Sequence, residues 1–334
     1  MASACSSATP TQQQSAASPS TGTRLIQHAF GETEVPANPT RIVVLGYFEV
    51  EALMSLGLQP IAAPAILVDN LLHLPPIENA ITDIGNPREP SLEQILALNP
   101  DLILTTKMFT ESDTYPLLSQ IAPTVVFDVD SQAEWQTVTH LCAEALGKEA
   151  EAEQLKANYE AKLQALQAQL SQDPSQIQVS VVYFYTVQIT TFGGETFIGS
   201  VLEAAGLSRP PKQLEGGNAQ VSMELLSDID GDVLFVMKPQ SQTEIAADVR
   251  VALDQMKERP LWGQLKAVQS NQVYEVDTYW FGVGYIAANL VLDDLMKYLG
   301  AFLRQKGMSR YPNSYARRGP LHNVSDDALN NLFH

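Results

Sequence analysis

The chain has 334 residues, of which 45% are apolar and 17% charged, and its 20 basic and 38 acidic residues give a net charge of −18. This length suits two domains, each large enough to bury its own core. The charge disfavours binding to nucleic acid or anionic lipid, because the field of the protein repels phosphate groups, and no apolar run approaches the ~20 residues that cross a bilayer.

The first 25 residues are predicted to form a flexible tether. Cys5 follows the small residues "ASA" and precedes "SSATPTQQQSAASPSTGT", a stretch too polar to bury a core. Small residues, a cysteine and a tether are typical of the lipid-attachment end of a bacterial lipoprotein, so Cys5 is the candidate lipidation site. The charged and apolar parts of a signal peptide are then expected to have been removed. The alternative is that residues 1–4 are accidental.

Residues 26–130 are predicted to form a first α/β lobe. "RIVVLG" indicates a buried strand, and "VEALMSLGL" a helix that ends at Gly57 with a left-handed cap. A second helix, "SLEQILALNP", has Ser91 as its expected N-cap and leads into the strand "DLILTT". "PLLSQIAPTVVFD" gives helix, turn and strand again. This alternation predicts a parallel sheet with helices on its faces.

Residues 131–175 are predicted to connect this lobe to a second one. From Glu134 to Ser171 there is no proline and one glycine, and Ala, Leu, Glu, Lys and Gln dominate. These residues favour helix, so we expect one long connecting helix, which permits only small changes in the angle between the lobes. The alternative is a surface helix within a single domain, which the α/β pattern that follows makes less favourable.

Residues 176–303 are predicted to form the second lobe, because a sequence pattern of the first lobe recurs there. "SLEQILALNPDLILTT" is echoed by "SMELLSDIDGDVLFVM", with Ser91 on Ser222, Glu93 on Glu224 and Asp101 on Asp232. The predicted fold is therefore α/β, with two related lobes, mainly parallel sheets and one long backbone helix. A ligand would bind in the groove between them, at the carboxyl ends of the strands. Residues 304–334 are expected to form an extended tail, to which we assign no function.

The order of these motifs resembles the periplasmic binding proteins that serve ABC importers of iron-siderophores, haem and cobalamin. The resemblance covers roughly Phe30 to Gly300 and rests on "PTRIVVLG", "LMSLGLQPIA", "IGNPREPSLEQILALNPDLILTT", "TFGGETFIGSVLEAAGL", "PLWGQLKAVQSNQVYEVD" and "YWFGVGYIAANLVLDDL". It implies a monomeric, lipid-anchored periplasmic protein that captures a ferric siderophore and delivers it to an inner-membrane permease. Haem or cobalamin capture on the same fold is the alternative.

In this family a surface glutamate on each lobe pairs with arginines of the permease. By motif position, Glu93 and Glu224 are the candidates for permease docking. Two carboxylates far apart on a rigid body can fix the register of a two-fold basic partner. The alternative is that each lies near a helix N-terminus only because the helix dipole favours a negative charge there.

Loops after the strands supply the candidate ligand-binding residues. We expect Trp280 to face the groove, where ferric-hydroxamate binders of the family place a tryptophan, and Phe281 to turn into the core. The resemblance also has departures: Pro87 stands where those binders carry arginine, and Phe109 replaces their tyrosine. A different chelate is therefore expected. Aromatic and cationic side chains suit an anionic chelate, and the candidates are Tyr47, Arg88, Lys107, Phe109, Phe192, Tyr279 and Trp280, with Met108 and Lys238 nearby.

Metal-centred and enzymatic functions receive less support. The five histidines are scattered without ligand spacing, so no protein-bound metal is predicted. "GGET" lacks the glycine-lysine pair of a phosphate loop, and no G-x-S-x-G motif occurs. A metallocluster-assembly enzyme with paired lobes would need cysteine or histidine ligands in the groove. We therefore predict a non-enzymatic binding protein without an intrinsic cofactor, whose transported ligand is a ferric siderophore.

Overall fold

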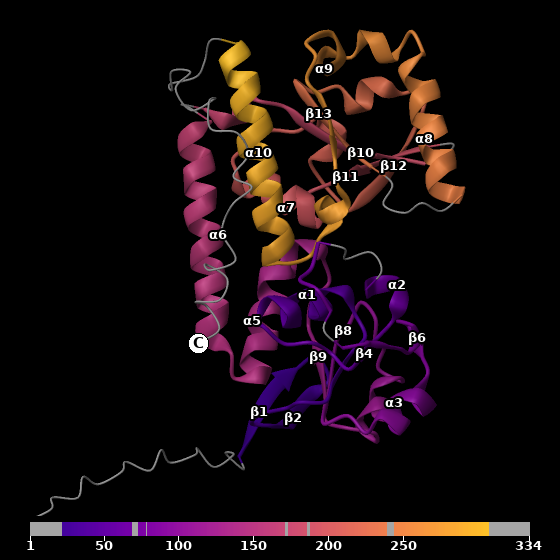
Figure 1. Ribbon diagram of the computed structural model, residues 1–334, viewed down its shortest axis with the longest axis vertical. Coiled ribbons are helices and arrows are strands. Elements are labelled where there is room, and N and C mark those ends of the chain that lie inside the picture. Colours follow the sequence, from indigo (N-terminus) through magenta and orange to yellow (C-terminus); the bar gives the residue numbers. More distant parts are fainter. Residues whose placement is uncertain are drawn as a thin grey trace, which may run out of the picture.

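The computed structural model describes residues 22–68, 73–77, 79–170, 173–185, 188–238 and 244–306. It contains two α/β lobes stacked along the long axis of the molecule, with two long helices, α6 (Glu149–Gln169) and α10 (Tyr285–Gln305), lying side by side along one flank (Figure 1). Within these ranges, no helix is both long and apolar enough to cross a membrane. Cys5 and the predicted tail from residue 307 onward lie outside the described residues.

The N-terminal lobe is built on a fully parallel five-stranded sheet in the order β5-β4-β3-β8-β9. Strands β3 and β8 consist wholly of buried residues, which explains the continuous apolar runs in their sequence. The antiparallel β1-β2 hairpin precedes this sheet, and a second hairpin, β6-β7, precedes α3. The strands are β1 (Thr23–His28), β2 (Gly31–Pro36), β3 (Ile42–Val44), β4 (Ala62–Ala63), β5 (Thr82–Asp83), β6 (Gly85–Asn86), β7 (Glu89–Pro90), β8 (Leu102–Thr106) and β9 (Thr124–Phe127); the helices are α1 (Tyr47–Ser55), α2 (Ala65–Val68), α3 (Leu92–Leu98) and α4 (Tyr115–Ser119).

The C-terminal lobe has a mixed sheet in the order β12-β11-β10-β13-β14. Strands β10, β13 and β14 are parallel, as predicted, whereas β11 and β12 pair antiparallel at one side. Strand β11 pairs antiparallel with β10, and the Tyr185 amide donates to the Gln188 carbonyl at 2.8 Å. The elements are β10 (Val179–Phe184), β11 (Gln188–Phe192), β12 (Asn218–Ser222), β13 (Val233–Met237), β14 (Val273–Val276), α7 (Phe197–Ala204), α8 (Glu244–Lys257) and α9 (Lys266–Gln269), with 3-10 turns η2 (Pro174–Gln176), η3 (Pro211–Gln213), η4 (Leu226–Ile229), η5 (Trp262–Gln264) and η6 (Thr278–Phe281).

The connecting segment forms two helices rather than one. After the 3-10 turn η1 (Gln132–Glu134), α5 (Trp135–Leu146) ends at Gly147, whose φ of 67° is the left-handed conformation that glycine adopts at low cost. The chain then begins again as α6. Helix α5 packs against α1 of the N-terminal lobe, and α6 packs against α10. Only α6 therefore runs as the predicted long connector, and the predicted domain boundaries stay predictions.

A buried aromatic cluster joins the helices of the two lobes. The Trp135 ring of α5 lies edge-on to Tyr159 of α6, Phe197 of α7 and Tyr285 of α10, with ring centroids 5.4, 5.6 and 4.9 Å apart. Edge-to-face aromatic pairs are more favourable than burial alone would make them. This junction supports the expectation that the lobes move little relative to each other.

The repeated aspartates have the same structural role in both lobes. The Asp101 carboxylate accepts hydrogen bonds from the backbone amides of Thr40 and Arg41, at 2.8 and 2.9 Å, just before β3. The Asp232 carboxylate accepts from the Gln178 amide at 2.9 Å, just before β10. Asp101 lies just before β8, which pairs in parallel with β3, and Asp232 lies just before β13, which pairs in parallel with β10. The repeated sequence therefore marks equivalent strand pairs.

The repeated serines are less alike. Ser91 is the N-cap of α3, as predicted, and its hydroxyl accepts from the Gln94 amide at 3.4 Å. Ser222 ends β12, and its hydroxyl accepts from the Glu224 amide at 3.3 Å in a turn that leads only into η4. The helix predicted after Ser222 is thus shortened to a 3-10 turn. Glu93 and Glu224 are both exposed.

Candidate functional site: the groove between the lobes

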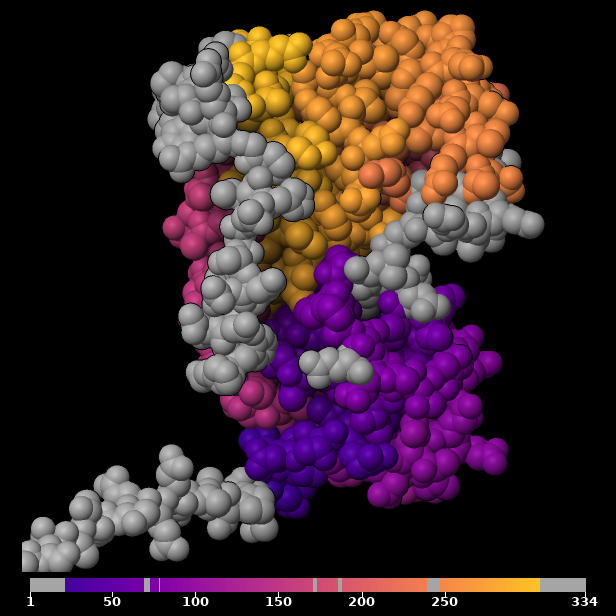
Figure 2. Space-filling model, viewed as in Figure 1, coloured from indigo at the N-terminus to yellow at the C-terminus, as the bar shows by residue number. Residues whose placement is uncertain are grey.

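The space-filling view shows a hollow between the two lobes on the side away from α6 (Figures 1 and 2). In the N-terminal lobe Tyr47 follows β3, Lys107 and Phe109 follow β8, and Arg88 lies in the β6-β7 hairpin. In the C-terminal lobe Phe192 ends β11, and Tyr279 and Trp280 follow β14. The lobes touch directly beside η1, where the Glu195 carbonyl accepts hydrogen bonds from the Ser131 hydroxyl at 3.1 Å and the Ala133 amide at 3.2 Å. We refer to this hollow as the groove.

The N-terminal wall brings together three of the predicted residues. Tyr47 opens α1, and its ring lies edge-on to Phe109 with centroids 5.2 Å apart. The guanidinium carbon of Arg88 lies 5.9 Å from the centre of the Phe109 ring, a distance at which a cation and an aromatic face attract. The Tyr47 hydroxyl accepts a hydrogen bond from Gln132 at 3.0 Å, and burial raises the pKa of this phenol. Because Phe109 is only 9% exposed, this wall offers mainly the neutral Tyr47 ring, with the Arg88 cation nearby.

The C-terminal wall is an aromatic cluster around Phe281. The Phe281 ring lies 5.3 Å from Phe192 and 5.2 Å from Tyr183, and Tyr183 lies 4.8 Å from Tyr185. Only Phe192 of this cluster was predicted as a ligand contact. The alternation in "YFY" could have predicted that Tyr183 and Tyr185 lie together, because residues two apart on a strand share a face. Phe184, between the two tyrosines, lies instead in the core on the other face.

The predicted orientations of Trp280 and Phe281 are reversed. Trp280 is 0% exposed, whereas Phe281 is 40% exposed. The Trp280 indole N–H donates to Asp294 of α10 at 3.0 Å and its ring lies 4.5 Å from Phe235. Because η6 is a tight 3-10 turn, successive side chains point in different directions; the indole, which needs a buried acceptor, takes the inward position. Tyr279 is partly buried, and its hydroxyl donates to the same carboxylate at 2.6 Å.

Two of the three cations considered for the groove already have carboxylate partners. Lys107 contacts Asp128 and, at 3.3 Å, Asp130, and these carboxylates raise the pKa of its ammonium group. Lys238 pairs with Asp277 at 3.0 Å. Within the described ranges Arg88 has no carboxylate partner. Among these cations, Arg88 is therefore the one most available to an anionic ligand group.

A buried carboxyl group lies beneath the N-terminal wall. Glu49 is 0% exposed, and a β-carbon added at Gly46 would lie 2.3 Å from its Oε2 atom. Neither of its oxygens has a hydrogen-bond partner among the described residues. Burial raises the pKa of Glu49 from 4.5 to about 7. Cys142 of α5 is also fully buried, and burial raises the pKa of its thiol.

The raised pKa of Glu49 predicts that the protein loses stability as the pH rises. Between pH 4.5 and about 7 the folded state holds a proton that the unfolded state has released, so the free energy of unfolding falls by up to about 3 kcal/mol through this interval. Urea denaturation of Glu49→Gln from pH 4 to 8 should lack this part of the pH dependence. Glu93→Gln, which changes an exposed carboxylate, should retain it. Parallel curves for Glu49→Gln and the wild type would contradict the prediction.

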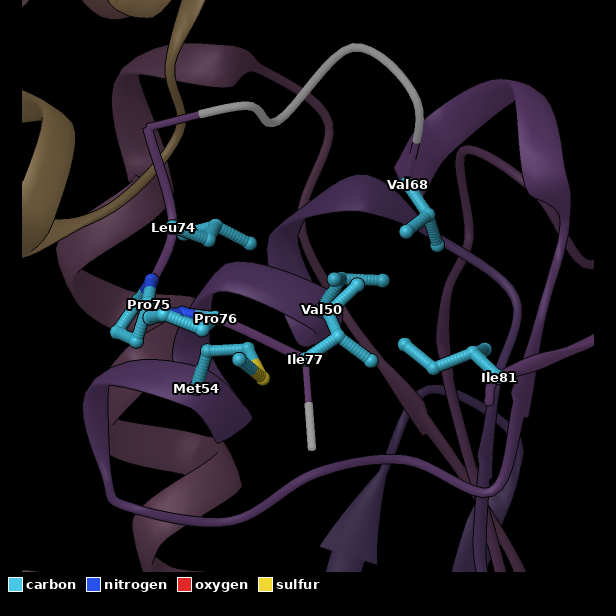
Figure 3. A pocket seen from close by; sticks show the side chains of 8 residues that line it. All are labelled: Val50, Met54, Val68, Leu74, Pro75, Pro76, Ile77 and Ile81. Carbon is cyan, nitrogen blue, oxygen red and sulfur yellow. The ribbon is translucent and has the colours of Figure 1, made fainter. Parts of the chain in front are cut away.

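A small apolar pocket lies beside α1, α2 and the 73–81 segment (Figure 3). Its volume is ≈ 210 Å³, below the ~300 Å³ at which ligand pockets ordinarily begin. Its lining side chains are all apolar and offer no group that would recognise the oxygen-rich rim of an iron chelate. They are Val50, Met54, Val68, Leu74, Pro75, Pro76, Ile77 and Ile81. The groove is therefore the better candidate site. No group of three or more metal-binding side chains gathers within the described residues.

Comparison with known proteins connects this architecture to one family. The family described as periplasmic binding protein matches residues 42–279. The probable siderophore-binding lipoprotein YfiY of Bacillus subtilis is 33% identical over 86% of this chain and 90% of its own length. The Fe(3+)-citrate-binding protein YfmC of the same organism is 30% identical over 78% of this chain and 80% of its own.

The solved structures agree with this assignment. The crystal structure of Staphylococcus aureus SirA in complex with staphyloferrin B has a TM-score of 0.68 and 29% identity, covering 83% of this chain and 98% of SirA. The resemblance predicted from the sequence is confirmed by these matches. The extent of the family match and the identity to YfiY lead to one conclusion: the chain belongs to the periplasmic binding protein family.

Proposed function

We propose that this protein captures a ferric siderophore in the groove between its lobes and delivers it to an ABC permease in the inner membrane. The observation that carries the proposal is the pair of aromatic walls on opposite lobes, with Arg88 at the edge of one of them. Relatives named for siderophore and ferric citrate binding, YfiY and YfmC, support it across most of the chain. Capture between lobes requires no reaction, and we propose a non-enzymatic role.

Recognition in this groove would act on the chelator rather than on the iron. Aromatic rings offer broad and rigid contact area, and a guanidinium group can donate two parallel hydrogen bonds to a carboxylate. We assign ligand contacts to Tyr47 and Arg88 on one wall and to Phe281 on the other. Phe109 and Phe192, which are 9% and 4% exposed, pack behind Tyr47 and Phe281 and support them. Lys107 and Tyr279 are assigned contacts at the rim, whereas Trp280 is withdrawn because it has no exposed surface.

The charge pattern favours a chelate of low net charge. Lys107 and Lys238 are paired with Asp128, Asp130 and Asp277, which would face a highly anionic ligand with their own negative charges. Like charges brought together at an interface lower affinity. We therefore expect a ferric trishydroxamate, which carries little net charge, to bind more tightly than a triply anionic ferric tricatecholate.

Titration of tryptophan fluorescence tests this function. The probes are ferric citrate, a ferric trishydroxamate, a ferric tricatecholate, haemin and cyanocobalamin, each added to the wild type. One ferric chelate should quench saturably, and Phe281→Ala should weaken its binding about tenfold, because one aromatic contact surface is lost. Leu25→Ala, an exposed apolar truncation on the distant β1-β2 hairpin, is the matched control. Saturation by haemin or cyanocobalamin alone would replace the siderophore with that ligand.

The same proposal assigns a location and a partner. Delivery to a permease requires the protein to be outside the cytoplasmic membrane and near it, so we propose a periplasmic monomer held there by lipid on Cys5. Glu93 and Glu224 are the proposed permease contacts, since they hold the same place in the repeated sequence motif and both are exposed. Mass spectrometry of the mature protein tests the lipid, because diacylation of Cys5 adds a characteristic mass to the N-terminal peptide.

A further inference from the structure

A buried carboxylate of the N-terminal lobe holds the first turn of the last helix of the C-terminal lobe. Glu51 of α1 is 0% exposed. Its Oε2 atom accepts a hydrogen bond from the Val283 amide at 3.0 Å, and its Oε1 atom accepts from the Ala287 amide at 2.9 Å. The first amides of a helix lack partners within it, and the positive end of the helix dipole favours a carboxylate. Glu51 therefore caps α10 from 232 residues away in the sequence.

Gly284 leaves room for this cap. It occupies the N-cap position of α10 with extended backbone angles, φ −161° and ψ −174°, and has no side chain with which to cap the helix itself. A β-carbon at this position would lie 2.7 Å from Cγ and 2.8 Å from Cδ of Glu51. Serine or aspartate, the usual capping residues, would therefore displace Glu51. Helix α10 thus has no cap of its own and is capped by Glu51 of the other lobe.

Both ends of this contact lie next to the groove walls. Tyr47 precedes Glu51 by about one helical turn on α1, and Phe281 precedes Val283 by two residues in the chain. His73 lies at the same junction, with its Nε2 atom 3.5 Å from Glu51 Oε2 and its ring 6.5 Å from that of Tyr279. The two hydrogen bonds thus connect the aromatic wall of one lobe to that of the other by a short rigid path.

We propose that Glu51 is a positioning residue that sets the separation of Tyr47 and Phe281 across the groove. The inference rests on the proposed function, since its consequence is ligand affinity. A cap within α10 could stabilise the helix equally well, but it would leave the two walls unconnected. Preorganised walls raise affinity because less order has to be imposed when the ligand binds. Glu51 itself contacts no ligand, because it has no exposed surface.

The test separates capping from positioning with two variants. Glu51→Ala should lower the thermal midpoint and weaken binding of ferric citrate or ferric trishydroxamate, whichever saturates the wild type, by about tenfold. Glu51→Ala/Gly284→Ser places a serine at the N-cap of α10 in the space that the glutamate vacated. This double variant should recover the thermal midpoint while its affinity stays low. Recovery of both would show that Glu51 only caps the helix, and would overturn the proposal.

An apo measurement keeps this test independent of the ligand. Spin labels on cysteines introduced at Leu117 and Leu261, exposed positions on the two lobes, report the distance between lobes when Cys5 is replaced by serine. Both the single and the double variant should broaden the distance distribution relative to the wild type. Unchanged distributions would overturn the positioning role. If the wild type bound none of the chelates, the proposed function would fail, and the distance distributions would still decide the role of Glu51.

Discussion

Reversing the charges of Glu93 and Glu224 together is expected to abolish siderophore uptake by cells while ligand affinity stays unchanged. Both side chains are exposed on separate lobes, and lysines at these positions would meet the arginines expected on the permease. Like charges facing each other across an interface cost several kcal/mol, which corresponds to a loss of more than about a hundredfold in association. Radioactive iron uptake measures the effect, and the fluorescence titration measures ligand affinity in the same variant.

A matched charge reversal separates docking from net charge. Glu144→Lys/Glu258→Lys changes the total charge equally at two other exposed glutamates, on α5 and just beyond α8, and should leave uptake near the wild-type rate. Equal losses in the two double variants would mean that uptake depends on overall charge. Lost ligand affinity in Glu93→Lys/Glu224→Lys would place these residues near the groove instead.

Truncating Trp280 to alanine is expected to lower the free energy of unfolding by about 3–5 kcal/mol, the usual cost of removing a large buried aromatic ring. The ring is fully enclosed between Phe235 and its neighbours, and its N–H satisfies one oxygen of Asp294. Removal therefore leaves a cavity and also takes a donor from a carboxylate. Urea denaturation followed by circular dichroism measures the loss without relying on the fluorophore that has been removed.

Phe281→Ala provides the comparison for this prediction. Its ring is partly exposed, so truncation should cost only about 1 kcal/mol of stability, while ligand binding weakens. Trp280→Ala should instead lose stability and keep its ligand affinity, provided that binding is measured well below the unfolding midpoint. A Trp280→Ala protein that keeps full stability but loses the ligand would restore the tryptophan to the groove wall.

The two neighbours in "YWF" show where sequence reasoning fails. Sequence favours neither orientation, since both side chains are large, apolar and suited to a core or a binding site. The choice is made by Asp294, an acceptor 14 residues further along the chain that α10 brings beneath the indole. The family resemblance assigned the groove position to Trp280, but the structure buries that residue and exposes Phe281 instead.

Charge pairing in the groove shows the same limit. Arg88, Lys107 and Lys238 looked equivalent in the sequence as cations after strands. The structure pairs Lys107 with two aspartates after β9, and Lys238 with an aspartate after β14. Because neighbouring parallel strands end at one edge, residues far apart in sequence meet there. Pairing across strands is set by the strand order, which the sequence pattern leaves open.

The sequence by itself determined the features that depend on near neighbours. Apolar runs gave the buried strands, Ser91 and Gly57 marked helix ends, and the repeated aspartates revealed the duplicated strand pair. These rest on backbone propensities and hydrogen bonds that act over a few residues or recur as a pattern. Only the tertiary structure decided that Trp280 is buried and Phe281 exposed, that Arg88 alone of the three candidate cations has no carboxylate partner among the described residues, and that Glu51 caps a helix of the other lobe. Each of these depends on groups that folding brings together from distant parts of the chain.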